Sequence, residues 1–444
     1  MTIKKEQVCI AGNGPNAYLA ARIFLEHGVE VTLIDSHHDL SQGTKLFKKF
    51  VLKNREKRKE LYSQGVPISN HNDSSVMPIE TRRAGGLTNL WGGVFFPPFL
   101  PYYKEKYSLG ITDFEEALGY FSADMFFEQG NAQNWNDIAT QEVVMSKSKV
   151  IHLTPQVALN KQGDLWNSAE LFDHLAHENL TKLNGTLVQV LPKKENVNVL
   201  IRLNDNFEEL TFNRLFLACG PIGNAKILAN SMSESAKISL VDSGVSYHLT
   251  LSLKSRPRIL SEMRPEKCGF YFGNHSLEGY YQYYGFSKEM IESLKYPALR
   301  GLARFLNKIT RNRLGLIILF KNDKDSKFIE VNRLNGSLYL GEGGRSNPKT
   351  TFKVFWNICK SLFFKGIIVA PFFLRGRAGE GAHSAGPNIG ELKSTNTNDA
   401  LIKDLEERIH LLGMSLDDRV LAGPVTFLSL VLTLKRLKAL LNDV

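Results

Sequence analysis

The first 35 residues combine short apolar runs with a run of small residues. Residues 8–11 and 29–34 are apolar runs of strand length, and residues 17–26 carry small apolar side chains along one helical face. A glycine-rich turn at residues 12–16 joins the first run to the helix, and Gly28 ends the helix. The pattern predicts a strand, a helix and a second strand, with the two strands parallel.

The turn of this unit has the pattern G-x-G-x-x-A, followed by an acid at the end of the second strand. Gly12 permits the tight turn, Gly14 lets backbone N–H groups approach a pyrophosphate, and Ala17 allows close packing of helix and strand. The helix N-terminus carries partial positive charge, and Asp35 is placed to bind a ribose hydroxyl. The expected ligand is a dinucleotide, either FAD or NAD.

A second part of this domain is expected after residue 186. Residues 187–191 and 197–202 alternate as strands of a small meander, and residues 214–221 form a buried strand that ends in Ala218-x-Gly220. In flavoproteins with two dinucleotide folds, such a strand returns beside the first one and passes the cofactor closely. This favours FAD over NAD, although the edge strand of any strand–helix–strand unit is the alternative.

Alternating polar and apolar residues from about 243 to 373 predict a second, antiparallel layer. Residues 248–253, 328–331 and 337–340 have strand periodicity, and Asn335-Gly336 is a hairpin turn. Aromatic side chains gather at residues 270–272 and 280–284, where they form either core pairs or a wall that stacks a substrate ring.

Composition and charge narrow the class of protein. The 444 residues are 43% hydrophobic and 23% charged, typical of a globular chain. No apolar run reaches the roughly 20 residues of a spanning helix. We expect no signal peptide, because residues 1–7 lack the longer apolar core and the small-residue cleavage site of one. The four cysteines are far apart, so we expect core thiols in a reducing compartment, no zinc site and a cytoplasmic location.

The formal net charge of +10 is concentrated at residues 45–59 and 295–313. In the second run Arg300, Arg304 and Lys308 recur at helical spacing, with Leu302 and Phe305 on a different side. Such a helix is either a solvated face packed on the core or a basic surface for anionic lipid or a phosphorylated substrate. Nucleic acid is not expected, because neither run lies in a nucleic-acid module.

Three later segments carry a family resemblance. Residues 84–93, AGGLTNLWGG, resemble the flavin loop of the glucose-methanol-choline (GMC) oxidoreductases. His383, in GAHSAG at 381–386, resembles the H-x-x-G segment of the family's active-site histidine, and residues 409–427 resemble its closing region before a terminal helix. The second active-site His or Asn expected near residues 423–425 is absent, which leaves His383 to act alone.

The resemblance implies an α/β fold, in which a Rossmann-like FAD-binding domain of the two-dinucleotide-binding type is interleaved with an α+β antiparallel-sheet substrate domain. The expected divisions are residues 1–242 and 376–444 for the FAD-binding domain and 243–375 for the substrate or cap domain. Leu90 occupies the position through which some relatives attach flavin, so noncovalent FAD is expected. The predicted cofactor contacts are Gly12, Gly14, Pro15, Asn16, Ala17, Asp35, Gly85, Gly86, Asn89, Trp91, Gly92, Val188, Ala218, Gly220, Gly413, Ser415, Pro424 and Thr426.

The resulting hypothesis is oxidation of a small-molecule alcohol, such as a carbohydrate or lipid-linked sugar. His383 accepts the hydroxyl proton while hydride passes to flavin N5. Oxygen, a quinone or another carrier is the electron acceptor, and residues 295–313 are a candidate peripheral contact with the inner membrane surface. A redox-neutral isomerase or mutase and a flavin-binding protein without turnover remain alternatives.

Overall fold

The structure is a computed structural model of the whole chain. It describes residues 6–35, 76, 86–89, 94–95, 107–123, 125–127, 150–153, 156–163, 166–204, 206–232, 235–253, 266–273, 276–285, 291, 297–311, 313–321, 327–343, 348–376, 378–379, 383–395, 400–417 and 425–442.

A parallel sheet lies at the centre of one half of the molecule. Its strand order is β21-β11-β1-β2-β7, and all four neighbouring pairs are parallel. The predicted strand–helix–strand unit is therefore present. The bounds are β1 Gln7–Ala11, β2 Glu30–Asp35, β7 Leu180–Asn184, β11 Arg214–Leu217 and β21 Ile409–Leu411.

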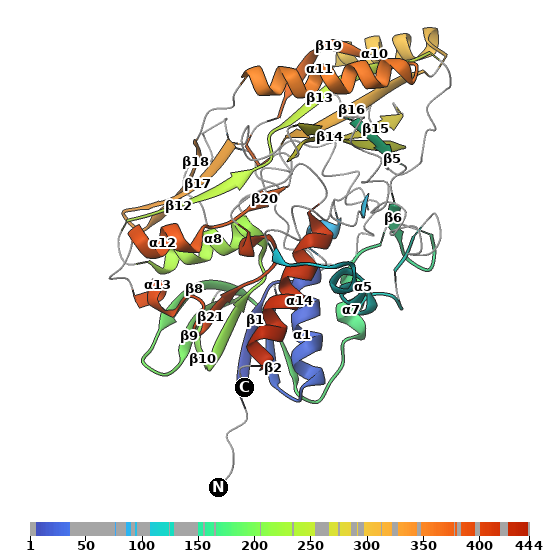
Figure 1. Cartoon of the computed structure of the whole chain (residues 1–444). Coiled ribbons are helices and arrows are strands. Elements are labelled where there is room, and N and C mark those ends of the chain that lie inside the picture. Colours follow the sequence, from blue (N-terminus) through green and yellow to red (C-terminus); the bar gives the residue numbers. More distant parts are fainter. Residues whose placement is uncertain are drawn as a thin grey trace.

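Helices cover both faces of this sheet. Successive side chains of a strand point to opposite faces, so a strand that is apolar throughout has two faces to bury. Val8 and Ile10 pack with helices on one face, whereas Cys9 and Ala11 pack with α8 and neighbouring strands on the other. Figure 1 shows α1 and α14 side by side along the sheet. The helices are α1 Pro15–Glu26, α5 Ile111–Gly119, α7 Ala169–His174, α8 Gly220–Ser231, α12 Ile389–Thr395, α13 Ala400–Asp404 and α14 Thr426–Asn442, with 3-10 turns η1 Gly86–Asn89 and η4 Gly413–Leu416.

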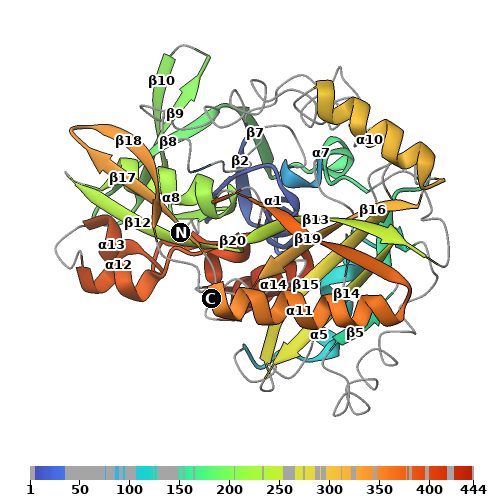
Figure 2. The same ribbon diagram turned by 90° about the horizontal axis from the view of Figure 1, so that it is seen from above.

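Antiparallel sheets form the rest of the molecule, as the alternating sequence predicts. The largest has the order β19-β13-β16-β15-β14-β5, with helices α10 Pro297–Ile309 and α11 Pro348–Phe364 on its two sides (Figure 2). Its strands are β5 Val150–Leu153, β13 Val245–Ser252, β14 Lys267–Gly273, β15 Ser276–Gly285, β16 Leu314–Lys321 and β19 Ile367–Arg375.

Three smaller sheets complete the fold. One has the order β18-β17-β12-β20, with β12 Ala236–Asp242, β17 Lys327–Leu334, β18 Ser337–Gly343 and β20 Ser384–Ala385. The others are β10-β9-β8, with β8 Thr186–Pro192, β9 Val197–Leu203 and β10 Asn206–Phe212, and β3-β6-β4, with β3 Val94–Phe95, β4 Phe126–Phe127 and β6 Gln156–Leu159. No described helix is long and apolar enough to cross a bilayer. The domain limits at residues 242 and 375 stay a prediction.

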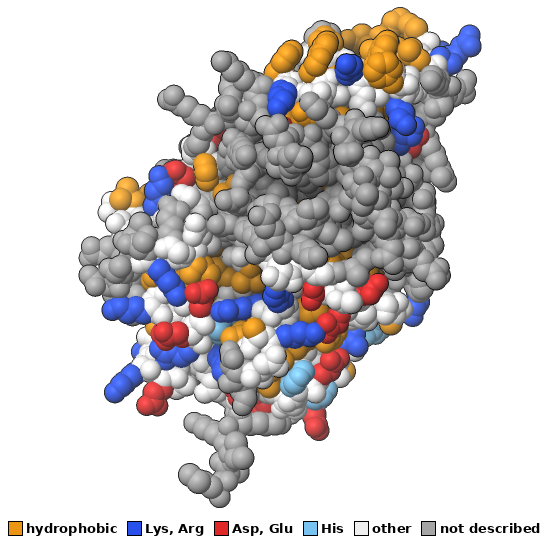
Figure 3. All heavy atoms as spheres, viewed as in Figure 1, with side chains coloured by type: hydrophobic (Ala, Val, Ile, Leu, Met, Phe, Trp, Pro, Cys, Tyr) orange, Lys and Arg blue, Asp and Glu red, His pale blue; other side chains and the backbone are white. Residues whose placement is uncertain are grey.

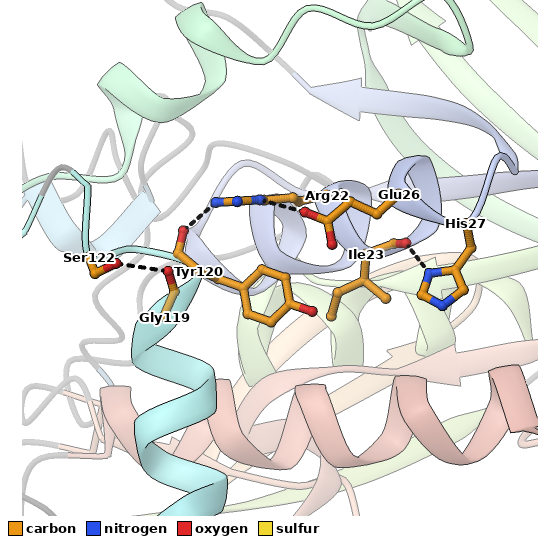
Figure 4. A network of polar contacts seen from close by, with 7 residues as sticks. All are labelled: Arg22, Ile23, Glu26, His27, Gly119, Tyr120 and Ser122. Carbon is orange, nitrogen blue, oxygen red and sulfur yellow. Dashed lines mark hydrogen bonds and ion pairs between the residues drawn. The ribbon is translucent and has the colours of Figure 1, made fainter.

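Polar contacts fix α1 against α5. Arg22 on α1 donates to Glu26 at 2.9 Å and to the backbone oxygen of Tyr120 at 2.7 Å, and its guanidinium lies 5.3 Å from the centre of the Tyr120 ring (Figure 4). At the end of α1, the His27 ring contacts the Ile23 carbonyl oxygen at 2.8 Å. These contacts hold the helix whose other end carries the glycine turn.

The expectation of four core thiols is wrong for one of them. Cys9 and Cys268 are buried and Cys359 is half-buried, but Cys219 is exposed. Cys219 lies two residues after the end of β11, and its thiol donates to the Ala11 carbonyl oxygen at 3.3 Å. It lies at the open carboxyl edge of the sheet, where apolar neighbours in the sequence do not imply burial.

Candidate functional site

The glycine turn lies between β1 and α1, at the carboxyl edge of the parallel sheet. Gly12 has φ +132°, and a Cβ atom there would lie 2.5 Å from the carbonyl oxygen of Ala218. The Ala218 N–H donates to the Ala11 carbonyl at 2.8 Å, so the two strands remain close beyond their paired residues. The position requires glycine because any side chain would overlap this neighbouring backbone.

Two more predicted cofactor segments leave the sheet at the same edge. Gly220 follows β11 and Gly413 follows β21, and the order β21-β11-β1 makes these strands neighbours. Carboxyl ends of parallel strands meet at one edge, where open α/β sheets bind ligands. The structure thus brings together Gly12, Gly220 and Gly413, which are far apart in the sequence.

The start of the predicted flavin loop rests on the glycine turn. A Cβ atom on Gly86 would lie 3.2 Å from the Gly14 Cα atom, a close approach between the two backbones. Thr88 anchors this segment, since its hydroxyl donates to the Asn167 side-chain oxygen at 3.0 Å and both residues are buried. Sequence reasoning missed Thr88 and Asn167, because no local pattern links a loop residue to one 79 positions later.

Asn16 joins the turn to the C-terminal helix. Its amide oxygen accepts from the Thr433 hydroxyl at 3.0 Å, and its amide nitrogen donates to the Ser429 hydroxyl at 3.2 Å. Thr433 in turn accepts from the Gly413 N–H at 2.9 Å. The Asn16 side chain is therefore a clamp between α1, η4 and α14, and its predicted contact with a cofactor stays a prediction.

A buried amide organises the turn after β11. Asn224 donates to the Leu217 carbonyl at 3.0 Å and to the Ser415 hydroxyl at 2.9 Å, and its oxygen accepts from the Cys219 N–H at 3.0 Å. These bonds satisfy backbone groups on both sides of Ala218, a predicted cofactor contact. Asn224 is buried on the inner face of α8. Sequence analysis missed it, although a polar side chain among the apolar residues of a helix could have identified it.

The segment that begins at His383 is bonded to η4. The N–H of Gly386, three residues later, donates to the Met414 carbonyl in η4 at 3.1 Å. The half-buried imidazole stacks on Phe320 with ring centres 4.7 Å apart. Nδ1 is enclosed and has no hydrogen-bond partner among the described residues. Burial lowers the pKa of His383 to about 4, so the ring is neutral at pH 7.

Asp242 holds the backbone around His383 in place. Its carboxyl accepts from the Gly379 N–H at 2.7 Å and from the Ser384 hydroxyl at 3.0 Å, and the carboxyl group is buried at the end of β12. The next N–H, of Ser243, donates to the His383 carbonyl oxygen at 2.9 Å. Asp242 is thus a positioning residue, which the sequence did not identify because its partners lie about 140 positions away.

A row of aromatic rings connects the six-stranded sheet to His383. Ring centres are 4.8 Å apart for Phe270 and Tyr280 and 5.7 Å apart for Tyr280 and Phe320, next to the Phe320–His383 stack. Tyr280 accepts from the Gln282 amide at 3.0 Å, and the Tyr284 hydroxyl donates to Gln282 at 2.5 Å. Burial raises the pKa values of Tyr280 and Tyr284, which keeps both neutral.

The other residues predicted to contact the cofactor are spread over several elements or lie outside the described residues. Pro15 and Ala17 are buried in the first turn of α1, and Thr426 begins α14. Val188 lies at a register shift in β8, where its carbonyl accepts from Asn230 at 3.0 Å. Outside the described residues lie Gly85, Trp91, Gly92, Pro424, the basic run at residues 45–59 and the side chains of Asp35 and Asn89.

The His410 ring stacks on Phe216, which packs with α1 and α14 on one face of the sheet, and the two ring centres are 4.8 Å apart. Burial lowers its pKa to about 3, aided by Arg436 and Arg214.

His410 should make the stability of the protein depend on pH. Between pH 6.5 and 3 the unfolded chain binds a proton at this ring and the folded chain does not, so stability falls as pH falls. Between pH 6 and pH 4 the free energy of unfolding should fall in both proteins, but in His410→Phe by roughly 2–3 kcal/mol less than in the wild type. Denaturant unfolding at both pH values measures this, and equal losses would contradict it.

Comparison with known proteins identifies the fold. The sequence matches no protein-family model and no curated protein. Among solved structures, the crystal structure of pyridoxine 4-oxidase from Mesorbium loti aligns with a TM-score of 0.65 over 99% of each chain, at 11% identity. At this identity the similarity is one of fold: the chain has the mixed α/β architecture of that protein, with parallel and antiparallel sheets throughout.

Proposed function

We propose that this protein is an FAD-dependent oxidoreductase that oxidises a CH–OH group of a small molecule. The observation that carries the proposal is the meeting of the glycine turns at residues 12–14, 86 and 413 with the His383 segment at one edge of the parallel sheet. The fold shared with pyridoxine 4-oxidase supports it. The interleaved domains with limits at residues 242 and 375 belong to this proposal.

The residues at this edge fit an extended dinucleotide. A Cβ on Gly14 would meet no atom within 4 Å, which leaves the turn's backbone open to a pyrophosphate at the N-terminus of α1. Asp35 at the end of β2 would hold the ribose, and Gly86 would cover the pyrophosphate. When bound, FAD accepts hydride from the substrate carbon. Leu90 offers no atom for covalent attachment, so we propose noncovalent binding.

His383 would act as the general base. Its neutral ring accepts the substrate hydroxyl proton at Nε2, because Nδ1 is enclosed. The Phe320 stack and the Asp242 contacts with the surrounding backbone fix where the ring lies. Because the base is already held in position, less entropy is lost when it is aligned with the substrate hydroxyl.

The aromatic row beside His383 supports a substrate with a ring, such as a carbohydrate or lipid-linked sugar. Tyr280 and Gln282 offer a buried apolar face with polar atoms at defined places, the usual composition of a small-molecule site. The electron acceptor is oxygen, a quinone or another carrier.

The visible spectrum of the purified protein, followed by anaerobic addition of an alcohol panel, tests the proposed function. We expect a flavin spectrum that bleaches with one class of alcohol, and a carbonyl product. Product at the oxidation state of the substrate would instead identify an isomerase or mutase. Bound flavin that no alcohol reduces would favour a binding protein, and a colourless protein would reject FAD.

A further inference from the structure

Helix α10 exposes apolar side chains on its outer surface. Ala303 is buried and Leu306 packs against the six-stranded sheet, yet Phe305 and Ile309 are each 60% exposed. Arg304 and Lys308 are also exposed, and each directly precedes one of these apolar residues, about 100° away around the helix axis. The helix therefore has three faces, one packed on the core, one apolar and open, and one basic.

Helix α11 repeats this arrangement on the other side of the same sheet. Val354, Ile358 and Leu362 are buried against the sheet. The outer surface exposes Phe352, Trp356 and Phe363, with Lys353 and Lys360 alongside. Figure 3 shows apolar and basic side chains together over the end of the molecule where Figure 1 places α10 and α11.

Although α10 and α11 cover opposite faces of the sheet, the turns that follow them reach the same end of β13, at one corner of the sheet. The Ser252 N–H donates to the Arg313 carbonyl at 2.9 Å, and the Leu253 N–H donates to the Gly366 carbonyl at 2.7 Å. This joins the turn between α10 and β16, the end of β13 and the turn between α11 and β19. We call the exposed side chains of this corner the docking rim: Leu253, Phe305, Ile309, Phe363, Phe364 and Ile368, with Arg304, Lys308, Arg311 and Lys365.

Apart from the run at residues 45–59, the protein's positive charge is concentrated in the segments that contribute to the rim. Residues 297–321 and 343–379 contain thirteen Lys and Arg and no Asp or Glu, whereas the whole chain carries +10. The rest of the chain is therefore slightly acidic. Clustered exposed apolar groups mark interaction sites, and cations around them select an anionic partner.

We propose that the docking rim binds the surface of an anionic membrane, independently of the proposed enzymatic function. Phe, Leu and Ile side chains would enter the boundary between headgroups and acyl chains while the Lys and Arg side chains contact anionic headgroups. A second copy of this chain would bring the two cationic surfaces together and repel. A nucleic acid offers phosphates but nothing to bury the aliphatic side chains.

Flotation of the purified full-length protein with lipid vesicles tests the proposal. We expect binding to vesicles of phosphatidylcholine with phosphatidylserine, weakening with salt, and little binding to phosphatidylcholine alone. Arg304→Gln with Lys308→Gln should lower binding about 30-fold, the factor for ~1 kcal/mol per cation at an anionic leaflet. Phe305→Ser with Ile309→Ser should lower it at least about tenfold, because less apolar area is buried.

The matched controls carry the same changes far from the rim. Phe207→Ser removes a side chain that is 58% exposed on β10, and Lys194→Gln removes an exposed cation in the β8–β9 turn. Both should bind vesicles as the wild type does, and all variants should keep its unfolding midpoint. The proposal is overturned by absent or salt-independent vesicle binding, by equal losses in the controls, by tighter binding to a nucleic acid, or by a dimer that the Phe305→Ser, Ile309→Ser variant dissociates.

Discussion

Replacing His383 with alanine is expected to lower kcat/KM for alcohol oxidation by roughly 10²–10⁴-fold while bound FAD is retained. The loss follows because the substrate hydroxyl proton then has no fixed acceptor. Anaerobic flavin reduction in a stopped-flow instrument measures the step directly, since it excludes reoxidation. FAD content is measured on the same sample.

The pH profile separates a base from a merely structural histidine. Because the pKa of His383 is about 4, kcat/KM in the wild type should be flat above pH 5 and fall as the ring is protonated near pH 4. His383→Ala should lack this dependence at its residual rate. His174→Ala, on an exposed turn of α7, is the matched control and should match the wild type in both rate and profile. Wild-type rates in His383→Ala would exclude the assigned role.

The second large effect is expected at Gly12. A methyl group there would lie 2.5 Å from the Ala218 carbonyl oxygen, in a backbone region with φ +132°. Strain of about 1–3 kcal/mol adds to overpacking of about 1–3 kcal/mol, so Gly12→Ala should lower the free energy of unfolding by roughly 2–6 kcal/mol. Denaturant unfolding of the protein without added FAD measures this.

Gly14→Ala is the comparison that separates folding from cofactor binding. Gly14 has φ −89° and space for a Cβ, so alanine should leave stability within about 0.5 kcal/mol of the wild type. Its methyl group would stand where the pyrophosphate approaches, and FAD affinity should fall. A variant that binds FAD normally would place the cofactor elsewhere.

The sequence predicted what depends on neighbours along the chain. The unit from β1 to β2 was predictable because Gly12, Gly14 and Asp35 stand at fixed spacings within one strand–helix–strand pattern. The alternation of residues after 243 likewise predicted antiparallel strands, and the basic helical segment predicted at residues 295–313 contains the observed helix α10. These signals are local, so they do not require knowledge of what packs against them.

The missed features depend on partners distant in sequence. Asp242 and Thr88 each hold a site segment through a buried side chain, and nothing in their own surroundings distinguishes them from ordinary polar residues. Similarly, the apolar side of α10 was visible in the sequence, but whether Phe305 met the core or solvent depended on the tertiary packing. Cys219 was expected to be buried because it follows an apolar strand, but it lies in the turn after that strand and is exposed.

The clamp at Asn16 links α1 to α14, two helices that are far apart in the sequence. Asn16 and Thr433 are separated by 417 positions, so this bond forms only after residue 433 has been translated. A polypeptide that lacks α14 would carry the first glycine turn without its bonds to Ser429 and Thr433. A stop codon before residue 429 would therefore remove the clamp while sparing Gly12, Gly86, Gly220 and Gly413.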